Sequence, residues 1–211
     1  MSLERAPRGR PRLFDRGEAL YAAMQIFWEH GYEGTSIALL SQELNLKPTS
    51  IYAAFGSKES LFKEAVALYI EGDGGVARRA LEIADTRDSI EAMLKDTVRS
   101  FCRAASPRGC LLLLGDKGLT ESDEAIRTFL KEQRAALREL LPARLSRGVE
   151  AGDLPADTDV DAMATMVLLF LYGVSIDAAD GASESRLLKA VDVFLANWPM
   201  NPTVSHRTRS A

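Results

Sequence analysis

The stretch from residue 35 to residue 62, TSIALLSQELNLKPTSIYAAFGSKESLF, constrains the fold of this chain more than any other part. Three apolar residues at helical spacing give a first short helix one apolar face: Ile37, Leu40 and Leu44. Asn45 stands where the chain must reverse, and asparagine tolerates the left-handed backbone that is common at helix ends. Pro48 suits the first turn of a second helix, because its missing amide hydrogen would have no partner there. Two short helices joined by a tight turn are predicted.

The second of these helices has the features of a helix that enters DNA. Ile51 and Phe55 are expected to point inward, whereas Tyr52 and the hydroxyl-bearing residues at the helix start can face outward. An exposed helix start with hydroxyls and little bulk can place amides and hydroxyls against phosphates and base edges in the major groove. We therefore predict a helix-turn-helix motif over residues 36–55, inside a three-helix DNA-binding domain that spans residues 15–70.

Several positions at fixed spacing carry a resemblance to a known family: Gly31-Tyr32, Thr35-Ser36, Ile51-Tyr52, Phe55 and the run from Ser57 to Phe62. On these positions the chain resembles the DNA-binding core of the TetR family of one-component bacterial regulators. The resemblance covers about the first third of the chain. It implies an all-α protein whose last two long helices form a homodimer and whose C-terminal domain binds a small molecule. Where the family commonly has Ala-Gly and a small capping residue, this chain reads Leu44 to Lys47 (LNLK), which leaves the operator sequence open.

Candidate DNA contacts follow from the chemistry of the exposed positions. Thr49 and Ser50 are predicted to contact base edges and an adjacent phosphate, and Pro48 a thymine methyl group. Tyr52 can place its hydroxyl on a phosphate, as the resemblance also implies, although it could instead pack on the first helix. The full set within the domain is Thr35, Ser36, Lys47, Pro48, Thr49, Ser50, Tyr52 and Lys58.

Four members of this set have a second interpretation or a double role. Thr35 and Ser36 are expected either to contact phosphate or to act as helix caps alone. Lys47 is a poor cap and is expected to reach a phosphate or a guanine. Lys58 offers a cation beside free amides at a helix start, or is a solvated surface charge.

A basic N-terminal arm is predicted to add a second kind of DNA contact. The whole chain has a net charge of −4, yet residues 1–16 carry a local charge of +3. Arg8-Gly9-Arg10-Pro11 looks like the core of an AT-hook, and with Arg12 it can enter a narrow minor groove. This flexible basic arm is predicted to span residues 1–14, and the alternative is that the same residues are only a solvated disordered tail. Because bidentate side chains are scarce on the recognition helix, we expect phosphates and this arm to supply much of the affinity.

The remainder, residues 71–198, is predicted to be a helical ligand-binding and dimerisation domain, followed by a disordered tail over 199–211. Pro142 is expected to kink or split a long helix. A helix near residues 159–178 is apolar almost all the way round, and the final helix has one strong apolar face. We expect these two helices to form a four-helix interface about a two-fold axis, or else to complete a monomer core. The predicted dimer contacts are Met163, Val167, Phe170, Leu171, Val174, Leu188, Val191, Phe194, Leu195 and Trp198.

A cavity for a small apolar effector is implied by the resemblance and permitted by the composition. Its candidate lining residues are Met93, Phe101, Cys110, Leu112, Phe129, Met166 and Phe170. Cys110 could also sense electrophiles or oxidants, because a helix start and nearby Arg108 would lower its pKa; the alternative is a small buried hydrophobe. Cys102, on an apolar stripe, is expected to be inert. Two cysteines are too few for a disulfide framework and fit a reducing cytoplasm.

Other function classes fit the sequence poorly. The longest uncharged run, residues 162–176, is shorter than the roughly 20 residues that span a membrane, and the N-terminus is no signal peptide. Nucleophile-elbow, P-loop and metalloprotease motifs are absent from the sequence, so no enzyme, cofactor or metal is expected. We predict a dimeric repressor that is released from palindromic operator DNA by an effector. The alternatives are regulation through Cys110 and effector-independent architectural DNA binding; effector, operator, regulated genes and the sign of regulation stay open.

Overall fold

A computed structural model describes residues 14–103 and 108–199 of the chain. The predicted arm residues Arg8, Arg10 and Arg12 lie outside the described residues, as does most of the predicted tail. Throughout the described ranges the regular structure is helical, so the all-α fold class is confirmed. The elements are α1 (Arg16–Gly34), α2 (Ile37–Glu43), α3 (Pro48–Phe55), α4 (Lys58–Glu71), η1 (Asp73–Gly75), α5 (Val76–Ala80), α6 (Thr86–Cys102), α7 (Leu111–Leu114), η2 (Glu121–Asp123), α8 (Glu124–Glu150), α9 (Val160–Ala179) and α10 (Glu184–Ala196).

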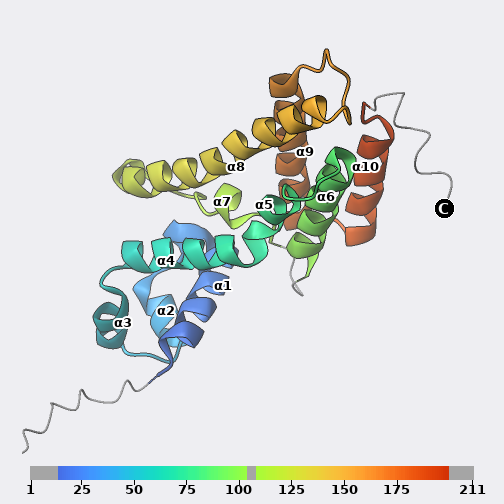
Figure 1. Ribbon diagram of the computed structural model, residues 1–211. Helices are drawn as coiled ribbons and strands as arrows, with labels where there is room; N and C mark the ends of the chain where they lie inside the picture. The colour runs from blue at the N-terminus through green and yellow to red at the C-terminus, as the bar shows by residue number, and fades with distance from the viewer. Residues whose placement is uncertain (1–13, 104–107, 200–211) are drawn as a thin grey trace, which may run out of the picture.

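Helices α1 to α4 gather at one end of the molecule around an aromatic core (Figure 1). Helix α1 begins at the cap Asp15, whose carboxylate accepts the amides of Gly17 and Glu18. The buried Phe27 ring meets the edge of Phe62 with centroids 5.0 Å apart, and α1 makes its closest packing with α4. The short helices α2 and α3 therefore rest on a rigid α1–α4 pair.

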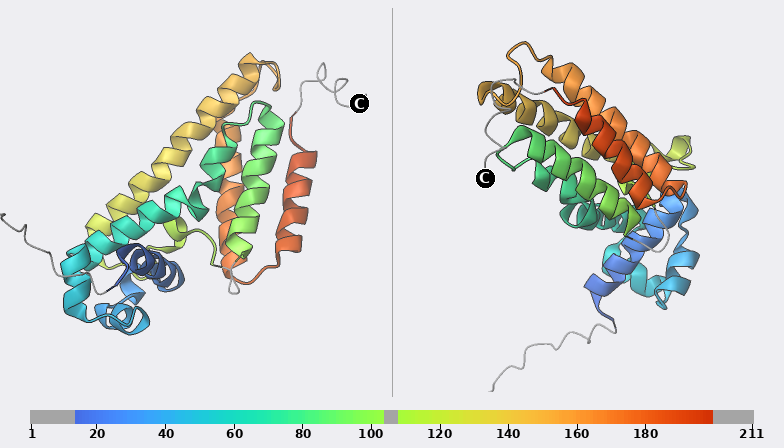
Figure 2. Two further views of the ribbon diagram at one scale, coloured as in Figure 1. Left: turned by 60° about the horizontal axis from the view of Figure 1, so that its bottom comes forward. Right: turned by 90° about the vertical axis from the view of Figure 1, so that its right-hand side faces the viewer.

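Helices α6, α8, α9 and α10 form the other body around a second apolar cluster. Figure 2 shows α9 and α10 side by side along one outer face of this body. The cap of α6 is Asp85, whose carboxylate accepts the amide of Asp88. Pro142 lies inside α8, which continues through it as one helix, so of the two expected outcomes, a kink or a split, the split is excluded.

The segment around α7 joins the two bodies. The indole Nε1 of Trp28 donates to the carbonyl of Gly109 at 2.9 Å, and the amide of Tyr32 donates to the carbonyl of Gly115 at 3.0 Å. Cys110 donates its amide to Ser175 Oγ of α9 at 2.8 Å. Three residues beyond the predicted boundary at residue 71 belong to the N-terminal core: Leu111, Ile126 and Leu130. A division of the chain at residue 71 thus cuts through a shared core.

Gly109 is expected to tolerate no side chain at this junction. Its φ is +65°, and a Cβ there would overlap the carbonyl oxygen of Ser175. Strain in the left-handed region and overpacking together predict that Gly109→Ala lowers the free energy of unfolding by about 2–5 kcal/mol. Gly152→Ala is the matched control, because Gly152 has φ +80° with open space around it, and about 1–2 kcal/mol is expected. Urea unfolding measures both; equal losses would show that the close approach to Ser175 is unimportant.

Candidate nucleic-acid interface and cavity

The turn between α2 and α3 is held by local hydrogen bonds. Asn45 adopts φ +50°, as predicted for the chain reversal. Ser41 accepts the amide of Leu46 on its carbonyl at 3.1 Å, and its hydroxyl donates to the carbonyl of Leu46 at 2.6 Å. Sequence reasoning missed Ser41, although a serine near a helix end commonly bonds the nearby backbone. These bonds fix the angle at which α3 leaves α2.

Helix α3 presents its start to solvent and its apolar face to the core. Ile51 and Phe55 are 1% and 4% exposed, so their predicted inward orientation is confirmed. Pro48 is the first residue of α3, and Thr49 is exposed. Tyr52 is 48% exposed, which rules out the alternative that it is packed away on α1. The outer surface of α3 is thus free to meet a partner.

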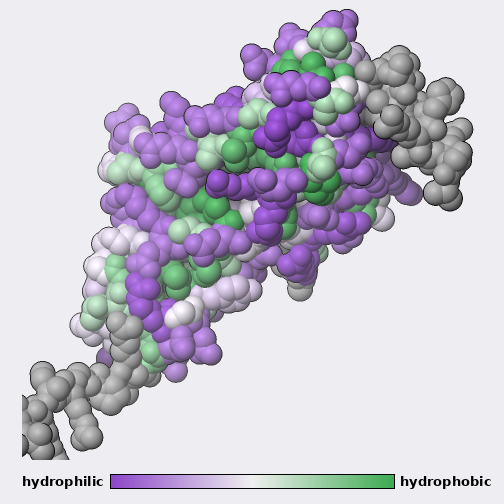
Figure 3. Space-filling view, viewed as in Figure 1, coloured by the Kyte–Doolittle hydropathy of each residue, from purple (hydrophilic) through white to green (hydrophobic). Residues whose placement is uncertain are grey.

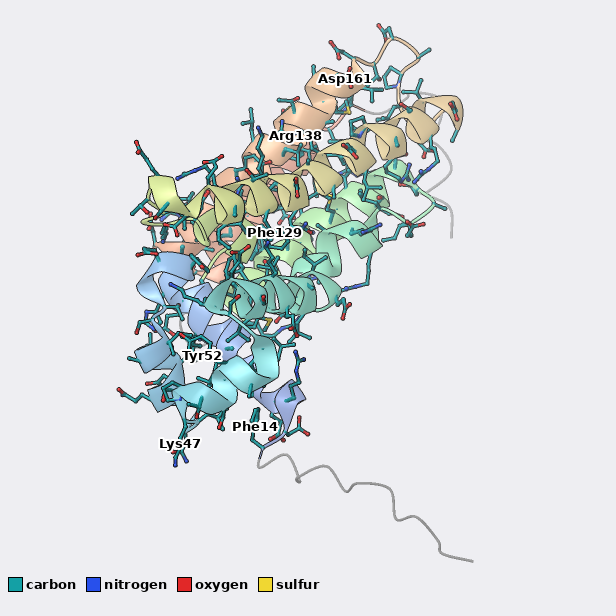
Figure 4. The ribbon with its side chains drawn as sticks, turned by 90° about the vertical axis from the view of Figure 1, so that its left-hand side faces the viewer. Phe14, Lys47, Tyr52, Phe129, Arg138 and Asp161 are labelled. Atoms are coloured by element: carbon teal, nitrogen blue, oxygen red, sulfur yellow. The ribbon has the colours of Figure 1, made fainter. Side chains whose placement is uncertain are left out.

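The other predicted contacts of α3 differ in exposure. Ser50 is half-buried, so it has less reach than Thr49. Lys47 precedes α3 as its cap residue and gives it no side-chain hydrogen bond, so its ammonium group is available to an anion. Lys47 lies at the extremity of the molecule in Figure 4 and points away from the body, and Tyr52 lies at the same end but nearer to the body.

The prediction that Thr35 contacts DNA is wrong. Its side chain is fully buried, and its hydroxyl donates to the carbonyl of Gly31 at 2.7 Å, where it secures the chain after the break in α1. Ser36 is exposed and caps α2, since its Oγ accepts the amide of Leu39 at 3.0 Å. A cap can also touch phosphate, so DNA contact by Ser36 stays a prediction.

Lys58 is held by the protein itself. Its Nζ lies 4.2 Å from the centre of the Tyr32 ring and 4.0 Å from a carboxylate oxygen of Glu33. Burial, followed by the carboxylates of Glu59, Asp123 and Glu33, raises the pKa of the Tyr32 phenol. Lys58 is therefore neither a solvated charge nor a free cation, and its contact with phosphate stays a prediction.

Arg16 has a structural role that sequence reasoning missed. Its Nη2 lies 2.7 Å from Glu64 Oε2 on α4, its Nε donates to the carbonyl of Ala54 at 3.2 Å, and its guanidinium lies 4.5 Å above the Phe55 ring. The arginine thereby ties α1 to the end of α3 and to α4. Because Glu64 neutralises Arg16, the positive charge of Arg16 is not available to the predicted DNA-binding arm.

A cavity of about 150 Å³ lies between the two bodies. Its walls come from α4 to α9, and three predicted residues line it: Phe101, Cys110 and Leu112. Sequence reasoning missed most of the rest, including Tyr69, Thr97, Arg134, Leu137, Leu140 and Tyr172. On the face shown in Figure 3, apolar side chains reach the surface among hydrophilic ones in the middle of the molecule.

Four predicted cavity residues lie elsewhere. Met93 is fully buried in the C-terminal core, and Phe129 packs on the N-terminal core with Lys63 Nζ 5.6 Å above its ring. Met166 is 45% exposed, and Phe170 packs on Phe194 with ring centroids 4.7 Å apart. Each of these residues is apolar at helical spacing, but the neighbouring helix, which the spacing does not reveal, decides what the side chain meets.

The pKa of Cys110 is raised, so the expected lowering is wrong. Burial is the main cause, and it outweighs the Tyr69 hydroxyl, the amides of Leu113 and Leu112, and the charge of Arg134, all of which lower the pKa. Arg108 is turned away: it donates to the carbonyl of Gln25 at 3.3 Å. Burial likewise raises the pKa of Cys102. Both thiols are therefore protonated at neutral pH.

The predicted dimer contacts divide between two faces of α9 and α10. Six of them belong to the protomer's own core, each at most 6% exposed, and cannot be contact residues: Val167, Leu171, Val174, Val191, Leu195 and Trp198. Met163, Phe170, Leu188 and Phe194 are half-buried. The residues that do face outward were missed: Met166, Leu169 and Ile176 of α9 and Val193 of α10, with 45%, 63%, 49% and 66% exposure. We call these four the α9–α10 apolar face.

Two further findings concern metals and membranes. Within residues 14–103 and 108–199, His, Cys, Asp and Glu form no group of three or more that could hold a metal ion. Helix α9, with 20 residues, is long and apolar enough to cross a membrane by length and composition alone, although its uncharged run is confined to residues 162–176. One face of α9 nevertheless packs in the core through Val167, Leu168 and Ala178, as expected of a core helix.

Family comparisons cover both bodies. A family model described as "Bacterial regulatory proteins, tetR family" matches residues 19–65. A second, described as "Tetracyclin repressor-like, C-terminal domain", matches residues 86–194. The chain is 33% identical over 196 residues to the HTH-type transcriptional repressor ComR of Escherichia coli (strain K12), covering 91% of this chain and 92% of that protein.

Solved structures agree with these matches. The TetR family transcriptional regulator CifR, as a triple cysteine mutant complexed with 26bp double-strand operator DNA, superposes with a TM-score of 0.85 at 42% identity, covering 90% of this chain and 100% of that one. A putative TetR transcriptional regulator from Rhodococcus sp. RHA1 superposes with a TM-score of 0.61 at 33% identity, covering 87% of this chain and 98% of that one.

Proposed function

The chain belongs to the TetR family of bacterial transcriptional regulators, and from that premise we propose that it is a dimeric repressor of palindromic operator DNA, released by a small molecule bound in the cavity. Proteins of this family are in general soluble, cytoplasmic regulators and not enzymes, and we infer the same for this chain. The observation that carries the proposal is the exposed start of α3, with Lys47, Thr49 and Tyr52 outward and Ile51 anchored in the core.

The chemistry of that surface supports DNA reading in two parts. Thr49 reaches base edges and Pro48 a thymine methyl group, while Lys47 and the Tyr52 hydroxyl position the helix on phosphates. Helix α3 has no Arg, Asn or Gln that could form a bidentate contact with a base. Phosphate contacts, together with the arm residues Arg8, Arg10 and Arg12, therefore supply much of the affinity.

A dimer supports the palindromic operator. Two copies that meet through the α9–α10 apolar face would present two recognition helices about a two-fold axis. DNA needs these helices one helical turn apart, ~34–36 Å, or a multiple of that distance. A shift of a few ångströms between the two DNA-binding bodies is then enough to weaken binding.

The junction around α7 supports the coupling between cavity and DNA. Tyr69 of α4 lines the cavity, and its ring meets Trp28 of α1 edge-on with centroids 4.8 Å apart. Trp28 is in turn hydrogen-bonded to Gly109, next to the cavity residue Cys110. A ligand that moves Tyr69 therefore acts directly on the α1–α4 pair that carries α3.

Selection of bound fragments from sheared genomic DNA tests the proposal. The full-length protein is expected to retain a small number of fragments, each with an inverted repeat that then gives a gel shift at low salt. Binding at very many unrelated sites would instead support the architectural alternative, and no shift on any fragment would contradict DNA regulation.

Lys47→Ala is expected to weaken binding to every DNA sequence by a similar factor. One phosphate contact per protomer is lost, so the slope of log K against log salt should fall by about 1 for each half-site. Titrations of the operator at four salt concentrations measure it. Lys131→Ala is the control, since Lys131 is exposed on α8, outside the DNA-binding helices; an unchanged slope in Lys47→Ala would remove Lys47 from the interface.

A second candidate function, sensing through Cys110, is favoured by one specific observation. Cys110 lines the cavity, where a small electrophile would meet its sulfur. Two of the three cysteine positions replaced in the CifR mutant are eight residues apart, as are Cys102 and Cys110 here. The raised pKa of Cys110 argues for slow reaction with reagents from solution and for dependence on binding in the cavity.

The reaction of Cys110 with N-ethylmaleimide is expected to follow its pKa. Because the pKa lies above its ordinary value, the thiolate fraction, and hence the rate, should rise about tenfold per pH unit from pH 6 to pH 8 without levelling off. A Cys102→Ser variant isolates Cys110, and mass spectrometry gives the rate. A plateau below pH 8 would contradict the raised pKa; full modification without loss of operator binding would contradict the sensor.

A further inference from the structure

We propose that the cavity selects an uncharged molecule of about the size of benzene or phenol that carries one hydrogen-bonding oxygen, held by the hydroxyls of Thr97 and Tyr69. This inference rests on the proposed function, because it names the class of effector that the cavity would take. It goes beyond an apolar effector by assigning a polar subsite and by excluding charged ligands.

The size of the cavity limits the ligand. A volume of about 150 Å³ is that of a cavity that holds benzene when its walls are apolar. The walls here are largely aliphatic and aromatic, with Phe101, Leu137 and Leu171 among them. A molecule of roughly six to nine non-hydrogen atoms fits such a space.

Two charged side chains of the walls, Arg134 and Asp73, are already paired, whereas Arg78 is exposed to solvent; the two pairs argue against an ionic ligand inside the cavity. The guanidinium of Arg134 donates to the carbonyl of Leu112 at 2.6 Å and lies 3.5 Å from a carboxylate oxygen of Asp116. Asp73 is paired with Arg103 at 3.0 Å. Beside Arg134 or Asp73, an ionised ligand would therefore lose its water and compete with a counter-charge that is already in place.

Two hydroxyls in the walls have hydrogen-bonding capacity to spare. Thr97 is 5% exposed, and its Oγ1 has no hydrogen-bond partner within the described part of the chain. The Tyr69 hydroxyl donates to Cys110 Sγ at 3.6 Å, and thiol sulfur is a weak acceptor. A ligand oxygen offers both hydroxyls a better partner than they now have.

Tyr69 stays a neutral donor in this subsite. Burial raises the pKa of its phenol well above the ordinary value, so the proton remains on the oxygen at physiological pH. When a ligand oxygen takes this proton as its hydrogen-bond partner, the contact between Tyr69 and Cys110 is exchanged. The Tyr69 ring packs on Trp28 of α1. A shift of Tyr69 on ligand binding would therefore also move Trp28 in the DNA-binding body.

The test compares toluene, phenol and benzoate, three probes with the same six-membered ring. Dissociation constants come from ligand-observed NMR titrations of the full chain. Phenol is expected to bind and benzoate to bind at least tenfold more weakly. Tyr69→Phe and Thr97→Val should each weaken phenol binding about 3- to 10-fold and change toluene binding by less than twofold. Thr128→Val, exposed on α8, is the control and should change neither.

Clear results would overturn the inference. They are absence of phenol binding, benzoate binding as tightly as phenol, or equal effects of both substitutions on phenol and toluene. The two variants act on different helices, so the failure of one to fold leaves the other as a test. Operator binding by the unliganded protein is measured on the same preparation: if it persists while phenol fails to bind, the proposed ligand class is wrong and the DNA-binding function stands.

Discussion

Replacing Leu169 with arginine is expected to convert the protein from a dimer into a monomer and to weaken operator binding by about 10²–10⁴-fold, the range gained when two linked modules bind together. Leu169 is 63% exposed on α9, so the protomer itself should fold with its stability changed by no more than about 0.5 kcal/mol. At a two-fold interface the substitution appears twice. Each copy would bury an unpaired guanidinium in an apolar contact.

The control for Leu169→Arg is Ile83→Arg. Ile83 is 38% exposed and lies between α5 and α6, outside the α9–α10 apolar face. Sedimentation velocity should show a dimer for the wild type and Ile83→Arg and a monomer for Leu169→Arg. A Leu169→Arg protein that stays dimeric with full operator affinity would place the interface on another face.

Arg144→Met is expected to lower the free energy of unfolding by about 3–5 kcal/mol, because buried acceptors without donors cost about 1–3 kcal/mol each. Arg144 is 2% exposed. Its Nη2 donates to the carbonyls of Ile83 and Ala84 at 3.0 and 2.7 Å, and its Nη1 to Thr86 Oγ1 at 3.0 Å. Thr86 is bonded in turn to Asp153, so the guanidinium joins α8 to the start of α6.

Arg147→Met, one turn further along α8, is the matched control. Arg147 is exposed and donates to the carbonyl of Leu81 at 3.3 Å, so its replacement should lower the free energy of unfolding by no more than about 0.5 kcal/mol. Urea unfolding at one fixed protein concentration compares the two variants, since a dimer's apparent stability depends on concentration. Equal stability of both variants would show that the α6 start needs no buried arginine.

At the DNA-binding end, the features that depend on residues close in sequence were predicted correctly, and those that depend on distant residues were not. The reversal at Asn45, the start of α3 at Pro48 and the inward face of Ile51 and Phe55 were all predicted, because each depends on residues within a few positions. The prediction for Thr35 was wrong because its burial depends on packing between α1 and the core. The spacing of hydroxyl residues in the sequence does not reveal that packing. Arg16 was missed because its partner, Glu64, is 48 residues away.

The cavity and the outer face required the arrangement of the helices. Helix α9 is apolar on nearly every side, so periodicity offers no unique inward direction. Contact with α6 and α8 decided that Leu171 faces the interior and Leu169 faces solvent. The cavity likewise joins residues from α4 to α9, such as Tyr69 and Thr97, which no sequence spacing relates.

By itself, the sequence determined that this protein is helical, where its helix-turn-helix lies and which side of α3 points outward. Helix period, turn residues and the start of a helix at proline act over a few residues and can be read in order along the chain. Only the tertiary structure decided which apolar residues are core, cavity or outer face, and which arginines, such as Arg144, are buried. Those outcomes depend on which helices become neighbours, and helices far apart in sequence become neighbours only when the chain folds.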